Sequence, residues 1–205
     1  MSERLTEYAK LVSMALIAVM TAGCLVSADD RGEHRPVFTP DGEHIVFMSN
    51  IHGGDWELFR AKADGSGVER LTENKGWDGY ADVSPDGKQL VFDRGSDDYS
   101  GPFLLNLESG EVQQLGNFKN KAGGARFSPD GRRVVIFEEV DEKRDLWLIH
   151  PQDGWKMMEL THTPEMNEHD AAFSPNGEYI AFAVALEKGS ALDIMNMRRD
   201  RKSVV

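Results

Sequence analysis

The chain reads Arg126-Phe127-Ser128-Pro129-Asp130-Gly131 in its middle, and it carries this pattern four times. The prolines of the four copies are Pro40, Pro85, Pro129 and Pro175. The steps between them are 45, 44 and 46 residues, obtained by subtracting successive residue numbers. A fixed period of this length is typical of β-propeller blades.

Each copy has the chemistry of a hairpin between two strands. Proline fixes one backbone angle, Asp or Asn tolerates tight turns, and glycine supplies a positive φ. A β-branched and aromatic run follows each turn, as in Ile45-Val46-Phe47, and favours a strand. A third strand is expected in four places: Glu57-Leu58-Phe59-Arg60, Phe103-Leu104-Leu105-Asn106, Asp145-Leu146-Trp147-Leu148-Ile149 and Asp193-Ile194-Met195-Asn196.

A fourth strand completes most of the units. It ends at Leu71-Thr72, Leu115-Gly116 and Leu160-Thr161, which makes each unit a four-stranded antiparallel meander. Such a meander cannot bury both faces alone, so neighbouring units must stack. The sequence therefore predicts an all-β propeller of about four blades, with units at roughly 36–79, 80–123, 124–168 and 169–205.

Composition limits the classes of partner. The 205 residues are 40% hydrophobic, enough for a packed core, and carry a net charge of −12. Nucleic-acid binding needs a surplus of Lys and Arg, so the sequence predicts no nucleic-acid partner.

The N-terminus is typical of an exported protein. An uncharged apolar run, 11–20, precedes Thr21-Ala22-Gly23-Cys24. Small residues before a cysteine resemble the lipobox of bacterial lipoproteins. That resemblance implies a signal peptide at 1–23, lipidation of Cys24 with anchoring to a membrane, and a tether at 24–35. The alternatives are an ordinary signal peptide and a membrane-spanning helix over 11–28.

Together, the turn motif, the strand that follows it and the Leu-Thr ending resemble the WD40-like PD40 repeat, which builds the TolB propeller and its relatives. The resemblance covers roughly residues 34–205. It implies a non-enzymatic protein on the periplasmic side of the bacterial envelope. It also implies that the propeller mouth binds a protein or peptide, with Pal and the Tol complex as the family's partners.

The number of units sets this chain apart from TolB, whose propeller has six blades. The fourth unit here ends without a Leu-Thr pair. The alternatives are a closed four-blade ring, an open or incomplete ring that pairs with a second copy or another chain, and a truncated fragment.

A binding mouth is expected where one unit passes to the next, at 74–82, 117–126 and 162–170. Equivalent positions in different blades can converge on one face of a propeller. The candidate mouth residues are Trp77, Asp78, Tyr80, Asp82, Arg126, His169 and Asp170. The competing interpretation is that they are solvated loop residues, or, for Trp77, part of loop packing.

An enzyme is the runner-up class. The chain lacks the Gly-x-Ser-x-Gly elbow of a hydrolase. Similar propellers occur in oligogalacturonate lyases, where histidines hold a metal, and His34 and His169 occupy equivalent repeat positions here. The sequence nevertheless predicts no catalytic residue, no metal and no cofactor. The aspartates of the Pro-Asp-Gly turns are expected to form turns, because Asn176 replaces one of them.

Overall fold

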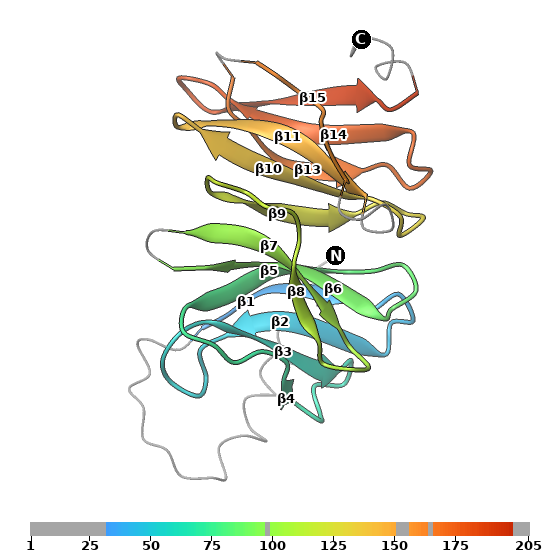
Figure 1. The fold of residues 1–205 in the computed structure, drawn as a ribbon. Coiled ribbons are helices and arrows are strands. Elements are labelled where there is room, and N and C mark those ends of the chain that lie inside the picture. The colour runs from blue at the N-terminus through green and yellow to red at the C-terminus, as the bar shows by residue number, and fades with distance from the viewer. Residues whose placement is uncertain (1–31, 97–98, 151–155, 164–165, 199–205) are drawn as a thin grey trace. The chain divides into compact units, whose positions relative to one another are not determined.

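The computed structural model describes residues 32–96, 99–150, 156–163 and 166–198 (Figure 1). These ranges contain four antiparallel sheets, three of four strands and one of three. They contain no helix, and so none that could cross a bilayer. The predicted all-β propeller architecture is confirmed, with a last sheet one strand shorter than the others. The predicted signal peptide and Cys24 lie outside the described residues.

Each sheet is a meander whose strands follow one another in chain order. The first sheet contains β1 (Glu33–Phe38), β2 (His44–Ser49), β3 (Glu57–Lys62) and β4 (Glu69–Arg70). The second contains β5 (Trp77–Val83), β6 (Gln89–Gly95), β7 (Ser100–Asn106) and β8 (Val112–Gln114). The third contains β9 (Ala122–Phe127), β10 (Val134–Val140), β11 (Lys143–His150) and β12 (Lys156–Glu159). The fourth contains β13 (Glu168–Phe173), β14 (Tyr179–Ala185) and β15 (Ser190–Asn196).

The chain divides into two compact units, one ending at Gly79 and one beginning at Tyr80. The first unit holds the first sheet and the start of β5. In the second unit the second, third and fourth sheets stack face to face in chain order, as blades do (Figure 1).

Two apolar clusters fill the spaces between the sheets of the second unit. Between the second and third sheets, Val91 and Leu104 pack with Phe127 and Ile136. Between the third and fourth, Val135 and Leu148 pack with residues that include Phe182. A single meander could not bury these side chains, so the stacking of blades supplies most of the core.

The three Pro-Asp-Gly turns and the Pro175-Asn176-Gly177 turn of the fourth sheet are built alike. In the second sheet the Ser84 hydroxyl donates to Asp86 Oδ1 at 2.6 Å and accepts the Gln89 N–H at 2.9 Å. The turn glycines all have positive φ, between 67° and 73°. The hydroxyl of Ser84 and the amide of Lys88 lower the pKa of Asp86. These aspartates are therefore turn formers, as predicted.

The third strands align differently from the prediction. The residue of the second strand that lies seven positions after the turn proline has a directly paired partner in the third strand. In the four sheets, taken in order, this partner is Phe59, Phe103, Trp147 and Asp193. The sequence motif had placed Phe103 at the position of Glu57 and Asp193 at the position of Asp145. In the structure, both residues lie two positions further along the strand than this alignment gives. Strand register is set by pairing and by the loop before the strand, and that loop differs in length between blades.

Candidate functional site

A left-handed residue interrupts the first strand of every sheet. The four positions are Arg35, Tyr80, Gly124 and Asp170, with φ between 54° and 67°. Each lies five residues before the turn proline. Three of the four are not glycine, and this conformation costs such residues about 1–2 kcal/mol. Bulges of this kind re-aim side chains and cluster at functional sites.

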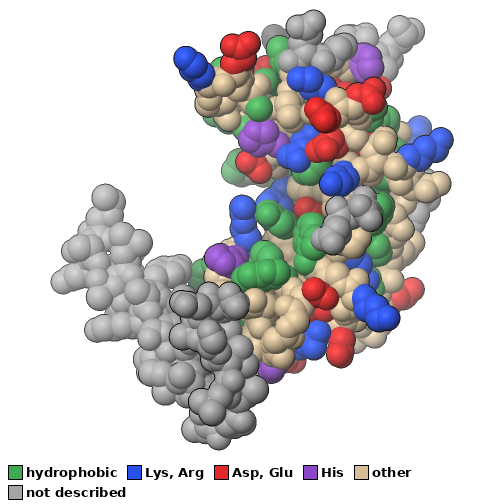
Figure 2. Space-filling model, turned by 90° about the vertical axis from the view of Figure 1, so that its left-hand side faces the viewer, with side chains coloured by type: hydrophobic (Ala, Val, Ile, Leu, Met, Phe, Trp, Pro, Cys, Tyr) green, Lys and Arg blue, Asp and Glu red, His purple; other side chains and the backbone are tan. Residues whose placement is uncertain are grey.

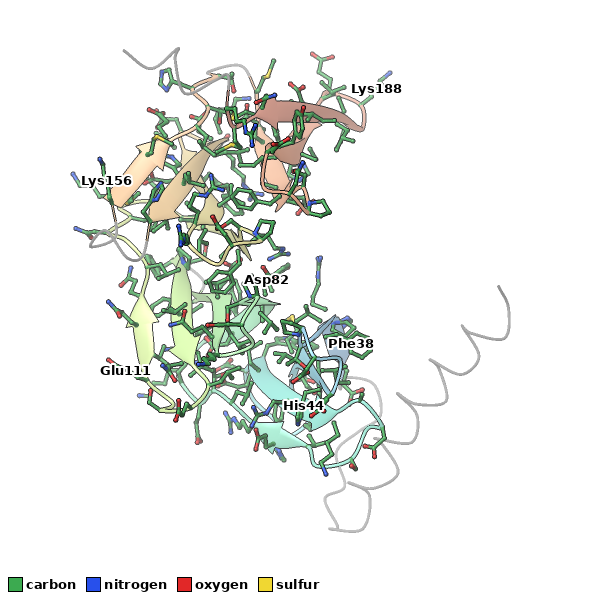
Figure 3. All side chains as sticks on the ribbon, turned by 90° about the vertical axis from the view of Figure 1, so that its right-hand side faces the viewer. Phe38, His44, Asp82, Glu111, Lys156 and Lys188 are labelled. Carbon is green, nitrogen blue, oxygen red and sulfur yellow. The ribbon has the colours of Figure 1, made fainter. Side chains whose placement is uncertain are left out.

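Strands β5 and β9 of the second unit lie side by side and are joined by two charged side chains. Arg126 Nη1 donates to the carbonyl of Tyr80 at 3.1 Å and to that of Ala125 at 2.7 Å. Asp82, labelled in Figure 3, accepts the Phe127 N–H at 2.8 Å. The structure thus brings together Asp82 and Arg126, two predicted mouth residues.

A third charged group, Asp93 on β6, belongs to the same cluster and was missed by the sequence analysis. Its side chain is buried, and its Oδ2 accepts the Gly124 N–H at 2.8 Å. Its Oδ1 has no hydrogen-bond partner among the described residues. Burial raises the pKa of Asp93 to about 6, although the Gly124 amide and the Arg126 charge act in the opposite direction.

Gly123 makes room for this carboxyl group. A Cβ atom at position 123 would lie 2.7 Å from Asp93 Oδ2, so any side chain there would displace it. Burial also raises the pKa of Asp82. We conclude that Asp82, Asp93 and Arg126 form a brace between the second and third sheets, which we call the inter-blade brace.

The remaining mouth residues fall into two groups. On β13, His169 is 24% and Asp170 81% exposed at the side chain, with Nδ1 and Oδ2 3.0 Å apart. Trp77 begins β5 and is half-buried, whereas Asp78 is fully buried and accepts from Asn74 Nδ2 at 2.9 Å. The end of each predicted mouth loop therefore belongs to the first strand of the next blade, because that strand begins several residues before the turn motif.

Asp78 belongs to a polar network that closes the first blade. The Thr72 hydroxyl donates to Glu57 Oε2 at 2.6 Å and accepts the Leu58 N–H at 3.0 Å. Glu57 also accepts the Asn74 N–H at 2.9 Å. The threonine of the Leu-Thr motif thus fixes the end of the blade to its third strand.

The third blade repeats this network. The Thr161 hydroxyl accepts the Leu146 N–H at 2.8 Å and donates to the buried Glu168. Thr163 donates to the other oxygen of Glu168 at 2.7 Å. The second blade has small or apolar residues at the equivalent positions: Gly101, Gly116, Phe118 and Ala122. Phe118 and Ala122 there join the apolar cluster.

Two groups of side chains have the spacing of metal ligands. They are Asp41, Glu43 and His44 in the first turn, and Asp145, Glu159 and His162 around β11 and β12. In the second group Asp145 accepts the Thr163 N–H at 3.1 Å, and His162 Nδ1 lies 3.0 Å from Glu159 Oε1. Within the described residues, neither group includes His34 or His169.

Comparison with known proteins finds several relatives, although no protein-family model matches the chain. The Tol-Pal system protein TolB of Francisella tularensis is 24% identical over 180 residues, which are 85% of this chain and 41% of that protein. An uncharacterized protein of Agrobacterium fabrum is 31% identical over 47% of this chain and 36% of its own length. The uncharacterized peptidase YuxL of Bacillus subtilis is 30% identical over 58% of this chain and 17% of its own length. This chain spans less than half the length of each.

Among solved structures, TolB from Acinetobacter baumannii superposes with a TM-score of 0.72 at 19% identity. The match covers 82% of this chain and 42% of that one. At this identity the likeness shows the fold. The chain is thus similar in sequence to TolB over most of its length, and its fold is that of β-propeller blades.

Proposed function

We propose that this protein is a non-enzymatic component of the bacterial cell envelope whose propeller binds a protein or peptide. The similarity to a Tol-Pal system protein over 85% of the chain supports the setting. The partner on this proposal is a Pal-like or Tol-like envelope protein, and the location is the periplasmic side of the envelope. Lipid chains on Cys24 hold the protein to a membrane.

The repeated left-handed bulge carries the proposal for the binding site. It occurs in the first strand of every sheet and is retained at Tyr80 and Asp170 in spite of its conformational cost. In the second unit it sets Tyr80, His169 and the exposed Asp170 on the first strands of stacked blades. Tyr80 lies in the second sheet, and His169 and Asp170 lie in the fourth. An aromatic ring and charged side chains of this kind are suited to contacts with a polar peptide.

Capture of the partner from envelope extract tests this site. The double variant His169→Ala/Asp170→Asn is expected to recover at least about tenfold less partner than the unchanged chain, equivalent to about 1.4 kcal/mol. Asn tolerates the left-handed conformation of residue 170, so the fold is kept. Recovery is measured by quantitative mass spectrometry and repeated with a purified Pal-like protein.

The matched control is Glu111→Gln, which removes one charge from an exposed turn of the second unit, labelled in Figure 3. It is expected to recover as much partner as the unchanged chain. Equal recovery by the double variant would remove His169 and Asp170 from the binding site.

Lipid anchoring is tested by cell fractionation. The unchanged chain is expected in the membrane fraction, and Cys24→Ser in the soluble or the uncleaved precursor form. The reason is that only a cysteine thiol can accept the thioether-linked lipid, and two or more chains give stable anchoring. A Cys24→Ser variant that is processed and stays membrane-bound would contradict this assignment.

A further inference from the structure

The last sheet carries exposed apolar side chains on one of its faces. On β15, Leu192 is 73% and Ile194 61% exposed, and Tyr179 on β14 is 40% exposed. Leu192 pairs with Ala183 and Ile194 with Ala181, and directly paired residues share a face of an antiparallel sheet. We call this surface the β14–β15 face; the two strands are labelled in Figure 1.

The opposite face of the same sheet is covered. Ile180, Phe182 and Val184 alternate with the exposed Tyr179 and two half-buried alanines along β14, and they pack against the third sheet. The sheet therefore has one face buried by a neighbouring blade and one apolar face in water.

The repeat shows what normally covers such a face. Ala181 and Ile194 form the pair that corresponds to two pairs in the preceding sheets, Val91 with Leu104 and Val135 with Leu148. Those four residues are 0–9% exposed. They are buried because the next blade packs on them.

The next blade makes this contact with the aromatic residue that ends its first strand, Phe127 in the third sheet and Phe173 in the fourth. The first sheet has Phe38 at this position, 45% exposed and labelled in Figure 3. Phe38 pairs with Ile45, so it lies on the same face as the apolar cluster of that sheet. On this face Phe47, Phe59 and Ala61 are already buried, whereas Phe38 is exposed at the position that a blade uses to contact its predecessor.

We propose that the β14–β15 face binds the first sheet of a second copy of this chain. Phe38 of the second copy packs against Leu192 and Ile194, as Phe127 and Phe173 pack within the second unit. Figure 2 shows acidic and basic side chains interspersed on the surface, so the net charge of −12 is not concentrated into a single-sign patch on that view. The contact joins two different surfaces and is therefore head-to-tail.

The mass of the full chain in detergent tests the proposal by light scattering. The unchanged chain, prepared unprocessed with a mass of 22.9 kDa, is expected as an assembly of two or more copies, and Ile194→Lys as a single copy. Ile194 is exposed within the chain, so the variant is expected to keep its circular dichroism spectrum. Leu186→Lys, in the β14–β15 turn and 56% exposed, is the matched control and is expected to keep the assembly.

Mixing two variants separates this contact from any association through residues 1–31, which are the same in all samples. Phe38→Asp and Ile194→Lys each lose one of the two surfaces and are each expected as single copies. Their mixture retains one intact pair of surfaces and is expected to form a complex of one copy of each. A single-copy unchanged chain, or a mixture that stays single-copy, would overturn the proposal.

Discussion

Replacing Thr161 by valine is expected to lower the free energy of unfolding by about 3 kcal/mol. Valine has the shape of threonine, so packing is preserved while the hydroxyl is lost. That hydroxyl accepts the Leu146 N–H and donates to Glu168, whose side chain is 1% exposed. The variant leaves a buried amide unpaired and a buried carboxyl with one donor fewer. Urea unfolding at neutral pH measures the effect.

The second blade suggests a double variant that tests whether Thr161 and Glu168 act together. It has Gly116 and Ala122 where the third blade has Thr161 and Glu168, and it packs this place with apolar groups. The double variant Thr161→Val/Glu168→Leu is therefore expected to be about 1–2 kcal/mol more stable than the sum of the two single changes. The control Glu187→Leu, in an exposed turn, is expected to change stability by less than about 0.5 kcal/mol. Additive single changes would show that the two groups do not act together.

The turns and the blade order were predictable because they depend on local chemistry repeated four times. The Pro-Asp-Gly motif fixes backbone angles over a few residues, and its hydroxyl–carboxylate bonds are local as well. The predicted fourth strands also end immediately before Leu71, Leu115 and Leu160. Nothing outside each unit is needed to produce these features.

The register of the third strands and the bulges in the first strands were not predicted from the repeated sequence motif. The register depends on which residues pair across the sheet. Asp193 therefore resembles Asp145 in sequence, but in the fourth sheet it occupies the register position that Trp147 has in the third sheet. The bulge positions hold Arg35, Tyr80, Gly124 and Asp170, and only the glycine hints at a left-handed backbone. Their equal distance from the turn proline was the signal that could have revealed them.

The binding role of the candidate mouth residues stays a prediction. Asp82 and Arg126, which were expected to face one mouth, lie close together on adjacent blades. The sequence did not show that they are half-buried, nor that Asp93 joins them from the middle of a hydrophobic strand. A buried carboxyl depends on its three-dimensional surroundings, here Gly123 and the Gly124 amide, which are about thirty residues away.

Raising the pH from about 4 to about 7 is expected to weaken the inter-blade brace through Asp93. Burial raises the pKa of Asp93 from 3.8 to about 6. A raised carboxyl pKa contributes stability that is fully present below the unfolded pKa and is lost as the pH rises through the folded pKa. The difference between 3.8 and about 6 corresponds to about 3 kcal/mol.

The variant Asp93→Asn isolates this contribution because asparagine does not titrate. Its unfolding free energy minus that of the unchanged chain is expected to increase by about 2 kcal/mol from pH 4 to pH 7. Any fixed effect of the amide on packing shifts all pH values equally. Asp86→Asn is the control, since the pKa of Asp86 is lowered and its contribution is lost only on acidification. The Asp86 difference is therefore expected to be flat between about pH 5 and pH 8.

The direction in which this free-energy difference changes with pH shows whether desolvation or the Arg126 charge has the larger effect on the pKa of Asp93. If the difference for Asp93→Asn rises with pH, desolvation of Asp93 outweighs the attraction of Arg126, and the carboxyl is held in the protein at a cost. If the difference falls with pH, the attraction of the Arg126 charge outweighs desolvation and the pKa of Asp93 is lowered, which would contradict a raised pKa. A difference independent of pH would show that Asp93 has the same pKa in the folded and unfolded chains. The burial of Asp93 favours the first result, because its Oδ1 has no hydrogen-bond partner among the described residues to replace lost water.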